Sequence, residues 1–310
     1  MKISVIGAGN VGATCADEIA RRELANEVVL LDIKEGISEG KALDLWQTAP
    51  VNLYDTRVKG STNDYAATAS SDVVVITSGL PRKPGMSRDD LISTNAGIVK
   101  SVTENVMKHS PNTIILMVAN PLDVMSYCAY LTSKLPSSKV FGMAGILDTA
   151  RFRAFLADEI KCSPKDIQAM LLGGHGDTMV PLPRYTTVSG IPVTEFVDGE
   201  KLDAIIARTK GGGGEIVKLM GTSAWYAPAA GVAQMVEAIV RDQKRIFPVC
   251  SWLTGEFGLN EVYMGVPVIL GKDGIEKIIE LKLNDAEMEL VKNSAAAVKE
   301  VMTVYDNMNK

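Results

Sequence analysis

The sequence Gly7-Ala8-Gly9-Asn10-Val11-Gly12 lies between an apolar run, Lys2–Ile6, and a segment with helical periodicity, Val11–Arg22. The apolar run predicts a strand, and the second segment places its apolar side chains on one stripe of a helix. A G-x-G-x-x-G pattern is informative only in this context, directly after a strand and at the start of a helix. The stretch therefore predicts the opening of a βαβ unit.

The three glycines of this stretch have distinct expected roles. Gly7 permits a tight turn, Gly9 lets the backbone approach a pyrophosphate, and Gly12 allows the helix to pack closely on the strand. The start of the helix supplies N–H groups and the positive end of its dipole. We expect the whole stretch to bind a dinucleotide, including the intervening residues Ala8, Asn10 and Val11.

Asp32 ends the next apolar run, Glu27–Asp32, and follows Gly12 by 20 residues. At that position a carboxylate can accept hydrogen bonds from the hydroxyls of an adenosine ribose. It would repel a 2′-phosphate, so the sequence favours NAD over NADP as the cofactor. A purely structural glycine turn with a surface aspartate is the alternative, because other nucleotide-binding proteins share similar turns.

The first half of the chain alternates short β-rich runs with helical segments, which is typical of parallel strands joined by crossover helices. The predicted strands are Lys2–Ile6, Glu27–Asp32, Asp72–Thr77, Thr113–Val118 and Val140–Met143, with a helix at Asn95–His109 besides the first one. We therefore predict an α/β protein whose N-terminal domain, residues 1–145, is a Rossmann domain with a doubly wound parallel sheet.

The second half, residues 146–310, predicts an α+β catalytic and substrate domain. Val266–Leu270 and Ile275–Leu281 flank a glycine-bounded turn, which indicates an antiparallel hairpin. Asn284 and Glu287 resemble a capping box that opens the last helix. Gly211–Gly214 predicts a flexible loop between two helices, since no strand precedes it to support a phosphate-binding turn.

The composition excludes several classes of protein. The 310 residues carry a net charge of −5, which leaves no broad basic field for nucleic acid or an anionic membrane. No apolar run approaches the ~20 residues of a membrane span, and the absence of a signal-peptide pattern favours a cytoplasmic location. The cysteines, Cys15, Cys128, Cys162 and Cys250, lack metal-ligand spacing, so we expect neither disulfides nor a metal site.

The chain has two histidines, and only one has a setting suited to chemistry. His109 ends a helical segment, where a surface cation suits the helix dipole. His175 lies in Gly173-Gly174-His175-Gly176-Asp177, where the glycines let a ligand approach the imidazole. General acid–base work near neutral pH suits an imidazole whose tautomer is fixed by a carboxylate, and Asp148 is the candidate partner. A buried structural histidine is the alternative.

Three arginines and an asparagine complete the candidate substrate site. Arg151 follows Asp148 by three residues, so both project from one side of a helix, and its guanidinium can hold a carboxylate bidentately. Arg82 and Arg88 lie in a segment with two prolines after the strand Asp72–Thr77, which we interpret as a hinged loop over an anionic substrate. Asn120 ends the next strand at the same edge and can hydrogen-bond substrate. An ion pair on a helix surface and a solvated basic loop are the alternatives.

These motifs occur together, in order, across most of the chain: GAGNVG, LPRKPGMSRDDL, VANPLD, ILDTARFR and GGHGDTMVP. The chain thereby resembles the lactate/malate dehydrogenase family, and within it the malate dehydrogenases of the bacterial type. The resemblance implies that His175 is the proton acceptor and donor, with Asp148 as its partner. It also implies that Arg151 binds the substrate carboxylate and that Arg88 polarises the reacting oxygen. The further contacts it implies are Asn120 and Ser223 with substrate, and Asn95, Val118, Ala119 and Asn120 with NAD. Ser223 departs from the family pattern, because the lactate-type relatives usually carry threonine there.

Within this family Arg82 distinguishes the substrates, because lactate-specific relatives place glutamine at that position. A second guanidinium matches the second carboxylate of malate and oxaloacetate, whereas lactate and pyruvate would leave it unpaired. The resemblance therefore favours NAD-dependent malate oxidation by a homodimer or homotetramer. A lactate or broader 2-hydroxy acid dehydrogenase and a non-catalytic NAD-sensing module are the alternatives.

Overall fold

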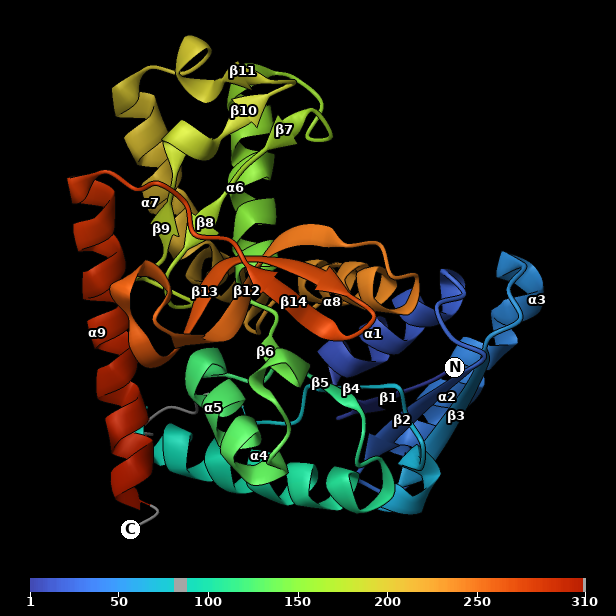
Figure 1. Ribbon diagram of the computed structural model, residues 1–310. Coiled ribbons are helices and arrows are strands. Elements are labelled where there is room, and N and C mark those ends of the chain that lie inside the picture. Colours follow the sequence, from blue (N-terminus) through green and yellow to red (C-terminus); the bar gives the residue numbers. More distant parts are fainter. Residues whose placement is uncertain (81–87, 309–310) are drawn as a thin grey trace.

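The computed structural model of the protein describes residues 1–80 and 88–308. Its centre is a sheet in which the strands follow the order β14-β13-β12-β6-β5-β4-β1-β2-β3 (Figure 1). The parallel part consists of β1 (Lys2–Ile6), β2 (Glu27–Asp32), β3 (Arg57–Thr62), β4 (Val73–Ile76), β5 (Ile114–Met117) and β6 (Val140–Gly142). The order 3-2-1-4-5-6 is that of the doubly wound Rossmann sheet, so the predicted fold class is confirmed.

Helices cover both faces of this sheet, which explains why its central strands are apolar throughout. Every residue of β4 and β5 is buried. Helix α1 (Asn10–Arg21) packs with α8 (Tyr226–Val240) on one face, and α4 (Arg88–His109) packs with α5 (Leu122–Ser133) on the other (Figure 1). Two further helices, α2 (Ile37–Gln47) and α3 (Ala49–Asn52), precede the edge strand β3. The carboxyl ends of the parallel strands are left to bind ligands.

Three antiparallel strands from the second half of the chain extend the same sheet: β12 (Arg245–Thr254), β13 (Asn260–Gly271) and β14 (Gly274–Ile278). The predicted hairpin is present, with Gly271 opposite Gly274. Strand β12 joins the parallel part where Cys250 pairs with Gly142 of β6. Hydrogen bonding thus continues across the expected boundary at residues 145 and 146, and the division into two domains stays a prediction.

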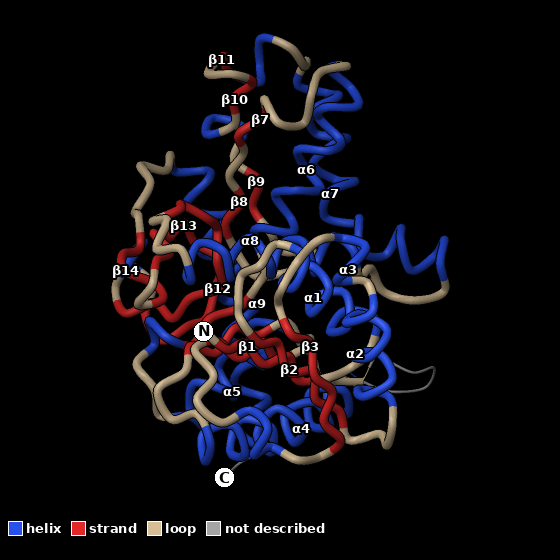
Figure 2. Tube along the Cα trace, turned by 90° about the vertical axis from the view of Figure 1, so that its right-hand side faces the viewer, coloured by secondary structure: helices blue, strands red, loops and turns tan. Residues whose placement is uncertain are grey.

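The rest of the second half forms a smaller layer beyond the sheet. Figure 2 shows α6 (Gly145–Ile160) and α7 (Gly199–Met220), which contact each other, extending away from the sheet toward β7, β10 and β11. The short strands are β7 (Ile167–Gln168), β8 (Leu171–Leu172), β9 (Val180–Pro181), β10 (Thr187–Val188) and β11 (Ile191–Pro192). Helix α9 (Asp285–Met308) closes the described chain and begins with the predicted capping box, in which Asn284 and Glu287 exchange hydrogen bonds of 2.9 and 2.8 Å.

The prediction of a flexible loop at Gly211–Gly214 is wrong, because these glycines lie inside the continuous helix α7. Each glycine in a helix interior costs about 0.5–1 kcal/mol relative to alanine, which is why the run indicated a break. Helix α7 is instead held by its packing on α6, where Leu202 lies in one buried apolar cluster with Phe152 and Leu156. Tertiary packing thereby outweighs local propensity.

Among the helices that the structure describes, none is both long and apolar enough to cross a membrane.

Candidate active site

The glycine turn between β1 and α1 has the geometry that its sequence requires. Gly7 has φ +105°, a region that side chains disfavour. A Cβ on Gly12 would lie 1.8 Å from the carbonyl oxygen of Gly7, so only glycine lets the helix start so close to the strand. A Cβ on Gly9 would meet no atom within 4 Å, and the backbone there faces open space.

Two charged side chains hold this turn in place. Asp32 lies at the end of β2 and accepts hydrogen bonds from the backbone N–H groups of Ala8, at 2.6 Å, and Lys34, at 3.0 Å. The ammonium group of Lys41, in α2, donates a hydrogen bond to the carbonyl oxygen of Ala8 at 2.7 Å. The sequence predicted Asp32 from its spacing, whereas it carried no signal for Lys41, since a lysine on a helix is ordinarily solvated.

These residues fit a dinucleotide. A cavity of about 290 Å³ is lined by Gly7, Gly9, Asp32, Thr77 and Gly79, among others. Gly9 stands at the N-cap of α1 and, having no side chain, leaves the first N–H groups of the helix for a phosphate. The open backbone and the carboxylate at the next strand end supply the pyrophosphate and ribose contacts that such a cofactor needs.

The carboxyl ends of β4 and β5 lie beside this turn. The segments that follow them are joined by hydrogen bonds to Asn95 of α4. Its side chain is buried, accepts a hydrogen bond from the N–H of Leu80 at 2.8 Å, and donates to the carbonyl of Asn120 at 2.7 Å. The N–H groups of Val118 and Ala119, which directly follow β5, both donate to Ile76. The contacts of these four residues with NAD stay a prediction.

The second site joins two segments that are distant in sequence. Asp148 lies in the first turn of α6, and His175 lies in the tight connection between β8 and β9, where Gly173 and Gly176 have positive φ. His175 Nδ1 lies 2.8 Å from Asp148 Oδ2. Arg151, one turn along α6, donates from Nη1 to Asp148 Oδ1 at 3.1 Å. The predicted trio is therefore brought together, with Asp148 in contact with both other side chains.

This arrangement determines the protonation of the imidazole. With Nδ1 bound to a buried carboxylate, the neutral ring carries its proton on Nδ1 and leaves Nε2 as the basic nitrogen. Burial lowers the pKa of His175, but the charge and hydrogen bond of Asp148 and the charge of Asp123 outweigh it. The pKa of His175 is therefore held above its ordinary value, although Arg151 acts in the opposite direction.

Asp123 is a second buried carboxylate beneath His175, and the sequence did not single it out. It lies in the first turn of α5, and its Oδ2 accepts the backbone N–H of His175 at 3.0 Å. Its Oδ1 accepts the thiol of Cys250, at 3.1 Å. Burial raises the pKa of Asp123 to about 6, against the hydrogen bonds and the charge of His175, which lower it. Acidic residues are common in the first turn of a helix, where they favour the helix dipole. The motif VANPLD therefore gave no reason to expect any other role for Asp123.

The structure says less about the remaining predicted substrate residues. Asn120 is exposed at the end of the β5 segment, and Ser223 lies exposed in the connection between α7 and α8. Arg88 begins α4, and the structure describes its backbone alone. Arg82 lies outside the described residues, so the expected loop over the substrate stays a prediction.

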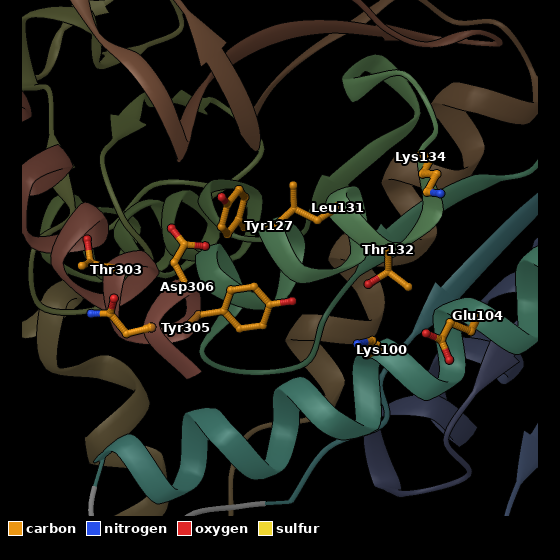
Figure 3. Close-up of a pocket in the computed structure, with 10 residues that line it drawn as sticks. Lys100, Glu104, Tyr127, Leu131, Thr132, Lys134, Thr303, Tyr305 and Asp306 are labelled. Atoms are coloured by element: carbon orange, nitrogen blue, oxygen red, sulfur yellow. The ribbon is translucent and has the colours of Figure 1, made fainter. Parts of the chain in front are cut away.

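A separate cavity of about 660 Å³ lies between α4, α5 and the end of α9 (Figure 3). It is lined by side chains of both charges, including Lys100, Lys134 and Asp306. None of its lining residues belongs to the glycine turn or to the group around His175. We therefore assign the chemistry to the latter two sites.

Comparison with protein families matches almost the whole chain. Residues 1–142 match the lactate/malate dehydrogenase NAD binding domain, and residues 146–307 match the lactate/malate dehydrogenase alpha/beta C-terminal domain. Malate dehydrogenase of Cytophaga hutchinsonii is 72% identical over 99% of both chains.

Solved structures agree with this result. Malate dehydrogenase from Salinibacter ruber superposes with a TM-score of 0.96 at 53% identity, over 100% of this chain and 99% of that one. Malate dehydrogenase from Plasmodium falciparum, in complex with NADH, gives a TM-score of 0.92 at 34% identity over 99% of both chains.

Proposed function

Because the chain belongs to the lactate/malate dehydrogenase family, we propose that the group around His175 carries out proton transfer in the oxidation of malate to oxaloacetate. Similarity to malate dehydrogenases over the whole length identifies the activity as that of an NAD-dependent malate dehydrogenase. The observation that supports the role of His175 is the 2.8 Å contact between its Nδ1 and Asp148 Oδ2.

The proton chemistry follows from that contact. In malate oxidation the neutral His175 accepts the proton of the C2 hydroxyl at Nε2, and Asp148 stabilises the imidazolium that forms. In oxaloacetate reduction the imidazolium returns this proton to the oxygen. Bound NAD supplies the acceptor for the C2 hydride, and its reduced form supplies the donor.

The substrate is held by cations. Arg151 donates one N–H to Asp148 and keeps further N–H groups for the substrate's C1 carboxylate. Arg88 polarises the reacting oxygen, Asn120 and Ser223 hydrogen-bond the substrate, and Arg82 pairs with the second carboxylate. An unpaired buried guanidinium would cost about 3–5 kcal/mol, so a monocarboxylate is disfavoured. This disfavours the lactate dehydrogenase alternative on chemical grounds.

The protein is also proposed to act as a homodimer or homotetramer. Large apolar side chains are exposed at α3, at the end of α7 and at the start of α8, namely Val51, Leu53, Leu219 and Tyr226. Exposed apolar side chains that gather into one patch mark association surfaces. A second copy of the chain is the partner we propose for them. The cytoplasmic location stays a prediction from the sequence.

The proposal is tested by exchanging His175 for asparagine and following NADH consumption with oxaloacetate. We expect turnover to fall by at least three powers of ten, while the affinity for NADH stays within about two-fold, because the glycine turn is untouched. His109→Asn is the matched control, because His109 ends α4 and lies outside the site. Retention of more than a few per cent of activity in His175→Asn would rule out this role for the imidazole.

A further inference from the structure

Helix α7 contains four consecutive glycines in its interior, at positions 211–214. Glycine weakens a helix because it has the most backbone freedom to lose on folding. Such a run inside one continuous helix indicates that at least part of it serves a purpose other than local stability.

The four glycines differ in what their α-carbons face. A Cβ on Gly212 would lie 3.2 Å from Cδ and 3.7 Å from Nε of Arg151, and a Cβ on Gly213 would lie 3.8 Å from its Nη2. A Cβ on Gly211 or Gly214 would meet no atom within 4 Å. The bare backbone at Gly212 and Gly213 therefore forms the surface against which the Arg151 side chain lies.

The Arg151 side chain is held on its other side by Asp148 and has little freedom to move. Its Nη1 donates to Asp148 Oδ1 at 3.1 Å, and only 14% of the side chain is exposed. Its Nε is buried and has no hydrogen-bond partner among the described residues, because the neighbouring surface of α7 is glycine backbone. The position of this guanidinium is thus set by its hydrogen bond to Asp148 and by the packing of the side chain against α7.

Helix α7 is itself fastened to α6 around this contact. The guanidinium of Arg208 lies 4.1 Å from the ring centre of Phe155 on α6, and Lys201 forms an ion pair with Glu159 of α6 at 2.8 Å. Arg208 also binds both oxygens of Glu215, which spans the glycine run along the helix. A side chain added at position 212 would therefore displace Arg151 more readily than it would displace the helix.

We propose that Gly212, assisted by Gly213, is a positioning residue for Arg151 and so sets the affinity of the enzyme for the substrate carboxylate. The inference rests on the proposed role of Arg151 in binding that carboxylate. A bidentate contact depends steeply on the placement of the guanidinium, because both N–H groups must stay aligned. A methyl group at position 212 moves Arg151 by a few tenths of an ångström and degrades this alignment. The cofactor site is unaffected.

The test is an alanine scan of the run, with each variant purified as the full chain. Gly212→Ala is expected to raise the KM for oxaloacetate about ten-fold, with kcat and the affinity for NADH within about two-fold of wild type. Hydroxymalonate is a dicarboxylate that already carries a hydroxyl group, so NADH does not reduce it. Its inhibition constant against oxaloacetate should rise by a similar factor. Gly213→Ala makes only an ordinary contact and should give a smaller change of the same kind.

Gly211→Ala and Gly214→Ala are the matched controls, because they add the same methyl group to the same helix where there is space for it. Both should keep wild-type kinetic constants and melt at an equal or slightly higher temperature, since alanine favours the helix. A KM for Gly212→Ala equal to that of these controls would overturn the inference. NADH affinity and melting temperature show whether Gly212→Ala is folded, and Gly213→Ala provides the test if it is not.

Arg151→Gln separates this inference from the function on which it rests. If Arg151→Gln leaves the KM for oxaloacetate unchanged, the proposed role of Arg151 itself is wrong. If Arg151→Gln raises the KM and both Gly212→Ala and Gly213→Ala leave it unchanged, the role of Arg151 stands and the positioning by α7 is wrong.

Discussion

Asp148 divides its two carboxylate oxygens between two side chains that we assign to different tasks. Oδ2 contacts the imidazole of His175, and Oδ1 accepts from the guanidinium of Arg151. One buried carboxylate thereby contacts both the proposed base and the group that we propose holds the substrate. Asp148 and Arg151 are three residues apart, so both hydrogen bonds of this carboxylate involve a single turn of α6.

The second carboxylate, Asp123, leads to a prediction for the pH dependence. Its charge helps to hold the pKa of His175 above the ordinary value, so Asp123→Asn should lower that pKa. Malate oxidation needs the neutral imidazole and falls as pH drops through the pKa, so its acidic limb should move to lower pH. Oxaloacetate reduction needs the imidazolium, so its alkaline limb should also move to lower pH. The profiles of kcat/KM in both directions measure this.

The pKa of Asp123 sets the pH range in which wild type and Asp123→Asn differ. Because burial raises the pKa of Asp123 to about 6, its charge acts on His175 above that pH and is lost below it. The wild type and Asp123→Asn should therefore differ mainly above about pH 6. Cys250→Ser keeps a donor to Asp123 and should leave the profiles unchanged. Identical profiles for wild type and Asp123→Asn would show that Asp123 supports the His175 backbone only.

The sequence predicted those site residues whose chemistry is tied to a motif. His175, Asp148 and Arg151 stand in glycine-rich or closely spaced contexts, and the structure places all three in contact. Asp123 and Lys41 were missed, because their partners are backbone groups brought near by tertiary packing, at His175 and Ala8. No local pattern encodes a contact of that kind.

At the level of elements, the other parallel strands and the β13–β14 hairpin were predicted, whereas the edge strand β3 was not. Strands β4 and β5 are uniformly apolar because they are covered on both faces, which makes them conspicuous. Strand β3 mixes exposed, intermediate and buried residues without a regular alternation and contains Lys59 and Gly60, so its sequence shows no clear strand pattern. The sequence predicted two helices separated at the glycines in place of α7, because local helix propensity does not report the packing of α7 on α6.

The capping box of α9 supports a prediction for stability. Asn284→Ala removes the side chain that accepts the N–H of Glu287, at 2.8 Å, and should lower the free energy of unfolding by about 0.5–2 kcal/mol. Asn293→Ala is the matched control, because it makes the same exchange at an exposed position inside the same helix. Denaturant unfolding of both variants measures the difference. Equal stability of the two would show that this cap does not stabilise α9.

At the scale of the whole molecule, the exposed apolar residues predict self-association. The wild type should elute as a dimer or tetramer in size-exclusion chromatography with light scattering. Leu53→Glu combined with Leu219→Glu should shift it toward the monomer, because both side chains are largely exposed in the single chain. Leu290→Glu, at an exposed leucine on α9, is the control and should change nothing. A monomeric wild type at micromolar concentration would contradict the proposal.

Preference for a 2-keto acid with two carboxylates is tested most directly by comparing substrates. The measurement is kcat/KM for oxaloacetate and for pyruvate at saturating NADH, in wild type and in Arg82→Gln. We predict that wild type prefers oxaloacetate by about two to three powers of ten, because pyruvate leaves the guanidinium of Arg82 unpaired. Arg82→Gln should lose most of this preference. Equal efficiency of the wild type with both substrates, or an equal loss on both in Arg82→Gln, would contradict the account.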